Sequence, residues 1–211
     1  MPSALSLRDR VVKRTLDLAV AGVGLIVSAP VLLAALAVAT IETRQSGLFR
    51  QTRVGRCGRS FELLKVRTMR SPSGVQSTVT VRGDERITKS GRILRGLKID
   101  ELPQLINVLR GDMSLVGPRP DVLGFADGLQ GHDRRILTVR PGITGPAAIA
   151  YRDEEAILAG VNNPEVYNRE VIWPDKVRIN LEYVDHYSVV ADVGYLVKTI
   201  RTVLQPGGGT P

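Results

Sequence analysis

Two adjacent carboxylates, Asp100 and Glu101, lie at the centre of a segment that is otherwise rich in cations. Five basic residues surround the pair between positions 91 and 120: Arg92, Arg95, Lys98, Arg110 and Arg119. Cations can hold a phosphate, while carboxylates can hold a divalent metal or attack phosphorus. The pair therefore indicates a site for phosphate and metal chemistry, although acids in the first turn of a helix are also an ordinary capping arrangement.

The elements around this pair are predicted to be two short helices. Apolar residues at helical spacing predict one helix over about 90–97. Asp100 is then the expected N-cap of a second helix that carries Pro103 in its first turn and ends near Gly111. In that position, the helix dipole and the nearby cations would both favour the ionised form of Asp100. An ionised, positioned carboxylate suits a phosphoryl-accepting nucleophile, and Glu101 beside it suits Mg²⁺.

Four further cations are expected to have a well-defined position, because each lies beside a proline or on a predicted strand. Arg119 lies between two prolines, whose rings fix φ, and a rigid guanidinium suits bidentate phosphate recognition. Arg140 stands beside a Pro-Gly turn in the same way. A β-hairpin is predicted over 47–69 with its turn at 55–58, and Lys65 and Arg67 share one face of its second strand. Each of these cations also fits an ordinary turn or a solvated strand face.

The composition limits the partners. The chain of 211 residues has a formal charge of +8, which favours a polyanionic partner: nucleic acid, an anionic membrane or a phosphorylated substrate. Aromatic residues make up only 4%, which is low for a protein that stacks bases on rings. Cys57 is the single cysteine, so the chain can form neither an internal disulfide nor a cysteine-based zinc site.

An uncharged apolar run extends from Leu18 to Ile41. As a helix it would be about 36 Å long, enough to cross a hydrocarbon core of roughly 30 Å. It is too long for the apolar region of an ordinary signal peptide. Basic residues flank the run on both sides, whereas a spanning anchor should carry them on one side. A re-entrant helix, which enters and leaves by the cytoplasmic face, satisfies both flanks.

The middle of the run supports the re-entrant interpretation over a spanning helix. Pro30 lacks an N–H and clashes with the preceding turn, so it bends the helix there. The freed backbone groups need partners in lipid, and the Ser28 hydroxyl is a candidate. Farther along, residues 70–83 are expected to form a loop. Helices are expected over about 177–188 and 191–204, the latter lying at the membrane interface or packing on the core.

Four motifs, in this order, resemble those of the monotopic phosphoglycosyl transferases of the bacterial sugar transferase family, in the small form with only the catalytic domain. They are KVRTM at 65–69, DELPQL at 100–105, GDMSLVGPRP at 111–120 and RPGITG at 140–145. The resemblance covers about residues 13–204. One departure concerns the helix break, where the family often has a Ser-Pro dipeptide. Here Ala29 precedes Pro30, and Ser28 is displaced by one position.

The resemblance implies an enzyme that moves a phosphosugar from a UDP-sugar onto a polyprenol phosphate such as undecaprenyl phosphate, and that releases UMP. This would be the first membrane step in making an exopolysaccharide, lipopolysaccharide or capsule. Asp100 would attack the sugar-bearing phosphate and form a covalent intermediate, and Glu101 would bind Mg²⁺. The residues expected to neutralise phosphate are Arg95 and Arg119, with weaker candidates in Lys65, Arg67 and Arg140.

The implied fold is α/β, mostly helical with a small β-hairpin, in a compact membrane-associated domain. Its expected parts are a basic segment with a Pro-kinked re-entrant helix (1–45), a catalytic domain with interfacial amphipathic helices (46–205) and a flexible tail (206–211). The expected location is the inner (cytoplasmic) membrane of a bacterium, with the catalytic domain on the cytoplasmic face. UDP-sugar, polyprenol phosphate and membrane lipid are the expected partners; a homodimer is compatible with the sequence, and no nucleic acid is expected.

Two other functions are compatible with parts of the sequence. A membrane-anchored nucleic-acid-binding protein would account for the charge, but it would lack aromatic residues and any recognisable binding motif. A non-catalytic scaffold for glycan assembly would account for the membrane segment and would not need the carboxylate pair. The order of the four motifs favours the transferase over both.

Overall fold

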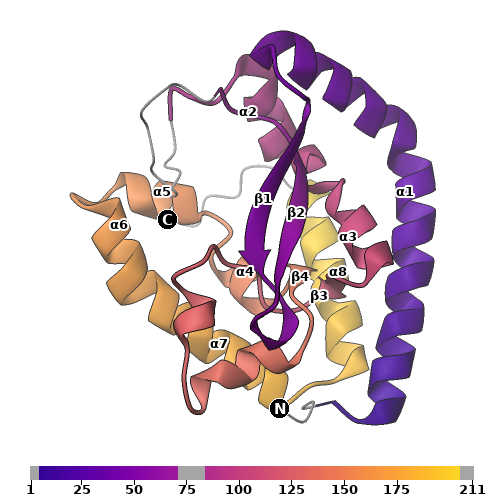
Figure 1. Ribbon diagram of the computed structural model, residues 1–211, viewed down its shortest axis with the longest axis vertical. Coiled ribbons are helices and arrows are strands. Elements are labelled where there is room, and N and C mark those ends of the chain that lie inside the picture. Colours follow the sequence, from indigo (N-terminus) through magenta and orange to yellow (C-terminus); the bar gives the residue numbers. More distant parts are fainter. Residues whose placement is uncertain (1–4, 71–83, 205–211) are drawn as a thin grey trace.

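The computed structural model describes residues 5–70 and 84–204. Its first element is one long helix, α1 (Leu7–Thr43), which begins at the N-cap Ser6 and ends at Arg44 in left-handed conformation. In the described part of the chain, α1 is the helix long and apolar enough to cross a membrane. It continues through Pro30 and bends over one end of the molecule (Figure 1). The apolar helix is confirmed, while its re-entrant course stays a prediction.

The predicted β-hairpin is confirmed. Strands β1 (Leu48–Val54) and β2 (Ser60–Val66) pair antiparallel, with Leu48 opposite Val66. The turn between them contains Cys57 and Gly58 at φ of 60° and 76°, the left-handed conformation that closes a tight connection. Most of the loop predicted at 70–83 lies outside the described residues. The hairpin brings Lys65, near the end of β2, toward the carboxylate pair.

The carboxylate pair lies between two short helices, but its local structure differs from the prediction. Helix α2 (Lys89–Gly96) is followed by a 3₁₀ turn, η2 (Ile99–Glu101), and then by α3 (Gln104–Arg110). The N-cap of α3 is Pro103, so the expected N-cap role of Asp100 is wrong. The reason is Lys98, whose φ of 57° starts a separate tight turn before α3 begins.

A second small sheet joins two of the motifs. Strands β3 (Ser114–Val116) and β4 (Gly142–Thr144) run parallel, and their backbones continue in close contact beyond β3. The N–H of Gly117 donates to Thr144 at 2.9 Å, and that of Gly142 donates to the Pro118 carbonyl at 2.8 Å. A Cβ on Gly142 would lie 2.1 Å from the nitrogen of Gly117, so this approach requires glycine.

Helices complete the domain, which is mostly helical as predicted. The C-terminal pair, α7 (Trp173–Asp185) and α8 (Val189–Leu204), confirms the two expected helices. Shorter elements connect β3 to α7: η3 (Ala126–Gly128), η4 (Asp133–Thr138), α4 (Pro146–Ala150), α5 (Glu154–Ala159), α6 (Pro164–Tyr167) and the π-helix η5 (Asn168–Ile172). Figure 1 shows α5 and α6 on the side of the molecule opposite to α1.

Polar side chains fasten the start of α1 to the domain. Asp17 accepts hydrogen bonds from the Ser114 hydroxyl at 3.0 Å and from the Leu115 N–H at 2.9 Å. Lys13 forms an ion pair with Asp192 of α8 at 2.5 Å, and both side chains are about nine-tenths buried. Asp17 and Lys13 therefore set the position of α1 on β3 and α8.

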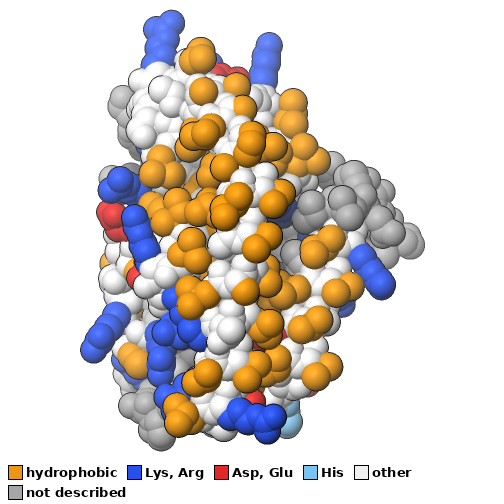
Figure 2. Space-filling view, turned by 90° about the vertical axis from the view of Figure 1, so that its right-hand side faces the viewer, with side chains coloured by type: hydrophobic (Ala, Val, Ile, Leu, Met, Phe, Trp, Pro, Cys, Tyr) orange, Lys and Arg blue, Asp and Glu red, His pale blue; other side chains and the backbone are white. Residues whose placement is uncertain are grey.

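The outward face of α1 is covered with exposed apolar side chains. Ile26, Val27 and Ile41 are each about three-quarters exposed. Figure 2 shows hydrophobic side chains along the whole length of this face. The inward face packs small and apolar residues, among them Ala21, Leu32 and Ala39, against the domain. An apolar face without a partner in the molecule indicates contact with membrane or protein.

Candidate active site

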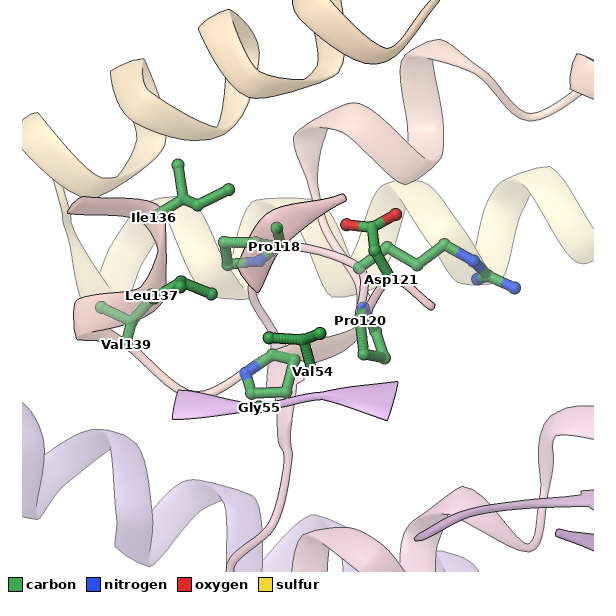
Figure 3. Close-up of a pocket in the computed structure, with 11 residues that line it drawn as sticks. Val54, Gly55, Pro118, Pro120, Asp121, Ile136, Leu137 and Val139 are labelled. Carbon is green, nitrogen blue, oxygen red and sulfur yellow. The ribbon is translucent and has the colours of Figure 1, made fainter. Parts of the chain in front are cut away.

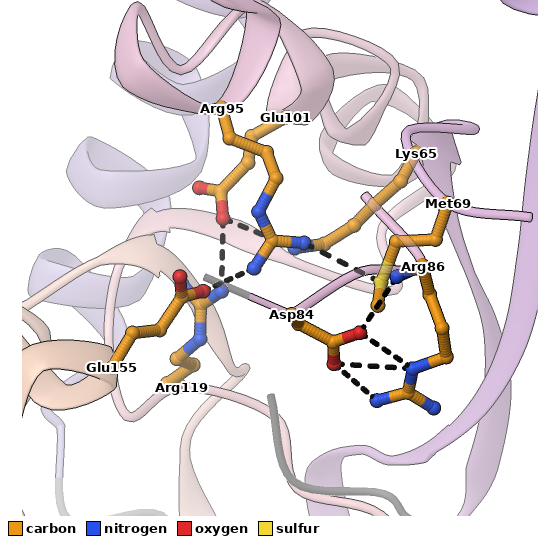
Figure 4. A network of polar contacts seen from close by, with 8 residues as sticks. All are labelled: Lys65, Met69, Asp84, Arg86, Arg95, Glu101, Arg119 and Glu155. Carbon is orange, nitrogen blue, oxygen red and sulfur yellow. Dashed lines mark hydrogen bonds and ion pairs between the residues drawn. The ribbon is translucent and has the colours of Figure 1, made fainter. Parts of the chain in front are cut away.

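Glu101 is held between two cations that come from different elements. Its Oε1 atom accepts from the Nζ of Lys65 at 3.1 Å and from Nη2 of Arg119 at 2.8 Å (Figure 4). Burial alone would raise the pKa of Glu101, but Arg119 and Lys65 outweigh burial and hold that pKa well below its usual range. Glu101 is therefore a fixed carboxylate that is ionised at neutral pH.

Asp100 has a different environment from its neighbour. It is 5% exposed, and its Oδ1 atom is buried with no hydrogen-bond partner in the described part of the chain. Burial raises the pKa of Asp100, and Glu101 adds to the rise, although Lys65 and Arg95 act in the other direction. The expectation that the surroundings favour ionised Asp100 is therefore corrected. The predicted cations are close, but the N-cap position is absent and desolvation dominates.

Arg95 lies in the same network, from the last turn of α2. Its guanidinium forms an ion pair with Glu155 of α5 and a contact with the sulfur of Met69 at 3.8 Å. Figure 4 shows that the Arg95–Glu155 pair lies next to Arg119 and Glu101. The structure thus places Lys65 of β2, Arg95 of α2 and Arg119 of the loop after β3 around the Asp100–Glu101 pair, which is called the dyad below.

Sequence reasoning missed a second group of charges behind Arg119. Burial raises the pKa of Asp121 to about 6, while burial and the charge of Arg119 lower the pKa of Arg53 to about 10. Lys176 forms an ion pair with Glu154 at 2.7 Å and helps to lower the pKa of Asp121 from a still higher value. The signal in the sequence is the position of Asp121, which directly follows Pro118-Arg119-Pro120 and therefore has to lie close to Arg119.

The loop that carries Arg119 rests on an apolar pocket (Figure 3). The pocket lies between the end of β1 and η4, and its apolar lining includes Val54, Pro118, Pro120, Ile136 and Leu137. Packing of both prolines against aliphatic side chains, together with their fixed φ, restrains the loop. This pocket therefore supports the Arg119 backbone, and Arg119 is the one side chain in its lining that could bind a phosphate.

Two of the arginines predicted to bind phosphate donate to backbone carbonyls instead. Arg67 donates to the Ser46 carbonyl at 2.7 Å and lies over the Phe49 ring. Arg140 donates to the Gly111 carbonyl at 2.8 Å. Neither contacts Asp100 or Glu101 among the described residues, so their part in substrate binding stays a prediction.

Within the part of the chain that the structure describes, the Ser28 bond of the predicted helix break is not formed, while the kink at Pro30 stays a prediction. Pro30 lies inside α1 without ending it. The hydroxyl of Ser28 is buried and has no hydrogen-bond partner within residues 5–70 and 84–204. The expected bond from Ser28 to freed backbone is therefore absent from this conformation of the helix.

The two carboxylates can contribute to a magnesium site but not complete one. Among the described residues, no group of three or more His, Cys, Asp or Glu side chains could hold a metal ion. Mg²⁺ commonly binds one or two carboxylates and takes its other ligands from water and substrate phosphates. The unpartnered Oδ1 of Asp100 beside ionised Glu101 fits that mode of binding.

Comparison with known proteins gives one family. The family model described as bacterial sugar transferase matches residues 8–206. A UDP-glucose:undecaprenyl-phosphate glucose-1-phosphate transferase of Caulobacter vibrioides is 36% identical over 91% of this chain and 69% of its own. The exopolysaccharide production protein PSS of Rhizobium leguminosarum bv. phaseoli is 35% identical over 95% of this chain and 99% of its own.

A third relative differs in length and in its named sugar. The UDP-N-acetylgalactosamine-undecaprenyl-phosphate N-acetylgalactosaminephosphotransferase of Aeromonas hydrophila is 34% identical over 92% of this chain. The matched region is 44% of that relative, so this chain spans less than half of its length. The names of the Caulobacter and Aeromonas relatives share a sugar-phosphate transfer to undecaprenyl phosphate but differ in the sugar.

Proposed function

Because the chain belongs to the bacterial sugar transferase family and is a transferase of phosphorus-containing groups, we propose that it moves a sugar 1-phosphate from a UDP-sugar to undecaprenyl phosphate or a similar polyprenol phosphate. UMP would be the second product. The observation that carries the proposal is the dyad. Glu101 is clamped by Lys65 and Arg119, while the adjacent Asp100 keeps a buried carboxylate oxygen without a partner.

Asp100 acts as the nucleophile in this proposal. Its Oδ1 forms a bond to the sugar-bearing phosphorus, and the bond from that phosphorus to the UMP oxygen breaks, so UMP leaves with the electron pair. An oxygen of the polyprenol phosphate then attacks the same phosphorus. The bond to Asp100 breaks, which regenerates the carboxylate and yields a polyprenol diphosphate sugar.

The cations around the dyad have separate tasks. Arg119, whose side chain is 41% exposed, can reach a substrate phosphate with N–H groups that Glu101 does not use. Lys65 lowers the pKa of Asp100 and so favours its nucleophilic form. Arg95 is paired with Glu155, so it becomes available to phosphate when that pair opens. Mg²⁺ held by Glu101 would neutralise charge on the diphosphate, which leaves Asp100 free to attack.

A screen for UMP release tests the proposal. The full-length chain, undecaprenyl phosphate and Mg²⁺ are incubated with a panel of UDP-sugars that includes UDP-glucose and UDP-N-acetylgalactosamine. We expect UMP release with at least one sugar, and capture of labelled phosphosugar on Asp100 when the lipid is withheld. Full activity of Asp100→Asn would exclude the covalent mechanism. Failure of every UDP-sugar to release UMP would exclude the function.

The proposed setting is the inner membrane, with α1 re-entrant and the domain on the cytoplasmic face. Its support is the exposed apolar face of α1 and the presence of cations on both sides of the apolar run. Single cysteines at the exposed positions Arg8 and Gln45, in a Cys57→Ser background, should both react with an impermeant reagent from the cytoplasmic side. Labelling from opposite sides would establish a spanning helix instead.

A further inference from the structure

Three arginines gather on the side of the molecule that carries α1, outside the dyad network. Arg140 donates to the Gly111 carbonyl at 2.8 Å, and a Cβ on Gly111 would lie 3.5 Å from Nη2 of Arg14. Arg56 donates to the Thr138 carbonyl at 3.1 Å, two residues before Arg140. Burial lowers the pKa of Arg140, and the charges of Arg14 and Arg56 lower it further. Arg140 is thus close enough to Arg14 and to Arg56 to be repelled by both.

Carboxylates balance this arginine cluster only in part. In the part of the chain that the structure describes, none of Arg14, Arg56 and Arg140 forms an ion pair. Asp17 is the acid whose charge acts on Arg140, and one carboxylate offsets only part of the charge of three arginines. Each guanidinium has five N–H donors, and the contacts to backbone carbonyls occupy one on Arg56, one on Arg140 and two on Arg14. The cluster therefore has unused donors and a net positive charge, and both favour the binding of an anion.

The position of the cluster relative to α1 identifies the source of that anion. Arg14 precedes Leu18, the first residue of the apolar run, by four residues, or about 6 Å along the helix axis. This offset is the distance between the hydrocarbon edge and the headgroup layer of a bilayer, to the nearest few ångströms. Leu7 and Val11 on the same helix are 69% and 59% exposed. Figure 2 shows Lys and Arg side chains directly beside the hydrophobic face of α1.

We infer that Arg14, Arg56 and Arg140 form a binding site for the phosphate of an anionic membrane lipid, of the phosphatidylglycerol type. The phosphate would lie among the three guanidinium groups, while the acyl chains follow the apolar face of α1. The dyad is held by Lys65 and Arg119, which make no contact with the cluster. A phosphate bound there is therefore not positioned for attack by Asp100. The site would bind the enzyme to the bilayer, which is a role separate from the proposed reaction.

Lipid titration in detergent tests this inference on the full-length chain. Dioctanoyl phosphatidylglycerol is added to the purified protein, and bound lipid is counted by native mass spectrometry. One arginine near an anionic lipid contributes about 1 kcal/mol, so we expect Arg56→Gln to weaken binding by about five-fold. Arg56→Lys should keep most of the affinity. Arg169→Gln, which removes an exposed cation on the opposite side of the molecule, should have no effect.

Three further arms separate the sources of phosphate. Dioctanoyl phosphatidylcholine should bind weakly and equally to all variants, inorganic phosphate should not compete at equal concentration, and undecaprenyl phosphate should not displace the bound lipid. Competition by either phosphate, or unchanged affinity in both Arg56→Gln and Arg140→Gln, would overturn the inference. Thermal melts establish that each variant is folded. Because no UMP release is measured, the result is independent of the proposed function.

Discussion

Replacement of Arg119 by glutamine removes one of the two cations that hold Glu101. The Arg119–Glu101 contact is 2.8 Å long, and the Glu101 side chain is only 11% exposed. A hydrogen bond to a charged group contributes about 1.5–3 kcal/mol. Arg119 is 41% exposed and Lys65 remains in place, so we take the lower end of about 1.5 kcal/mol. If Glu101 is positioned for the reaction, kcat/KM should fall at least about ten-fold.

The loss should be larger if Arg119 also contacts a substrate phosphate. A second charged contact of the same size would bring the total to roughly 100-fold. UMP release at several UDP-sugar concentrations measures kcat/KM. The matched control is Arg50→Gln on β1, because Arg50 pairs with Glu62 at 3.6 Å and both side chains are about 60% exposed. Such a surface pair contributes about 0–1 kcal/mol, so activity should stay within about two-fold.

Two results would refute this reasoning. If Arg119→Gln keeps more than half of the kcat/KM of the original protein, the clamp on Glu101 has no part in the reaction. If Arg50→Gln lowers kcat/KM as much as Arg119→Gln, the loss reflects general charge and not the contact with Glu101.

Four other predictions follow from the buried charges and from the proline of α1. Asp100→Asn should lower UMP release at least about a thousand-fold, because it removes the nucleophile. The same change should raise the melting temperature, because burial disfavours the charged form of Asp100 and raises its pKa. This gain in stability should vanish at acidic pH, where Asp100 is neutral. Glu101 has a lowered pKa, so its contribution to stability should be complete above its usual pKa of 4.5 and lost as the pH falls below it. Urea unfolding at several pH values measures this contribution. In Glu101→Gln, the free energy of unfolding should fall less steeply at acidic pH. Lys13→Met should cost about 3 kcal/mol in urea unfolding because it leaves Asp192 buried without its cation, and Asp192→Leu in the same chain should recover part of the loss. Pro30→Ala restores a backbone donor in α1, so it should straighten the helix and shift the cysteine labelling toward the spanning pattern.

Features with a local cause could be predicted from the sequence. The hairpin follows from alternating side chains around a glycine-containing turn, and α1 follows from an uncharged apolar run. The local structure of Asp100 could not be predicted in the same way. A residue that can cap a helix was expected to do so, but the left-handed conformation of Lys98 created a separate turn, and the carboxyl became buried.

Long-range pairings account for the rest of the site. Lys65, Glu101 and Arg119 lie in motifs that are recognisable singly, but their convergence on one carboxylate oxygen depends on how the hairpin packs against η2. Arg95 and Glu155 are 60 residues apart, and no local pattern connects them. Arg119 and Arg140 look alike in sequence, since each adjoins a proline, yet they lie in different contacts. Tertiary packing decides which contacts each arginine makes, and the pattern of a single sequence does not predict that packing.

The close approach of Gly117 and Gly142 has a mechanical consequence. Hydrogen bonds on both sides of this crossing tie the chain before Arg119 to the chain after Arg140, and there is no room for a side chain between them. The two arginine loops are therefore one stiff unit, with Arg119 beside Glu101 at one end and Arg140 at the end of α3 at the other. If the proposed lipid site binds a membrane at Arg140, a displacement of Arg140 should therefore be transmitted to Arg119, and the proposed transfer should depend on the lipid composition of the membrane.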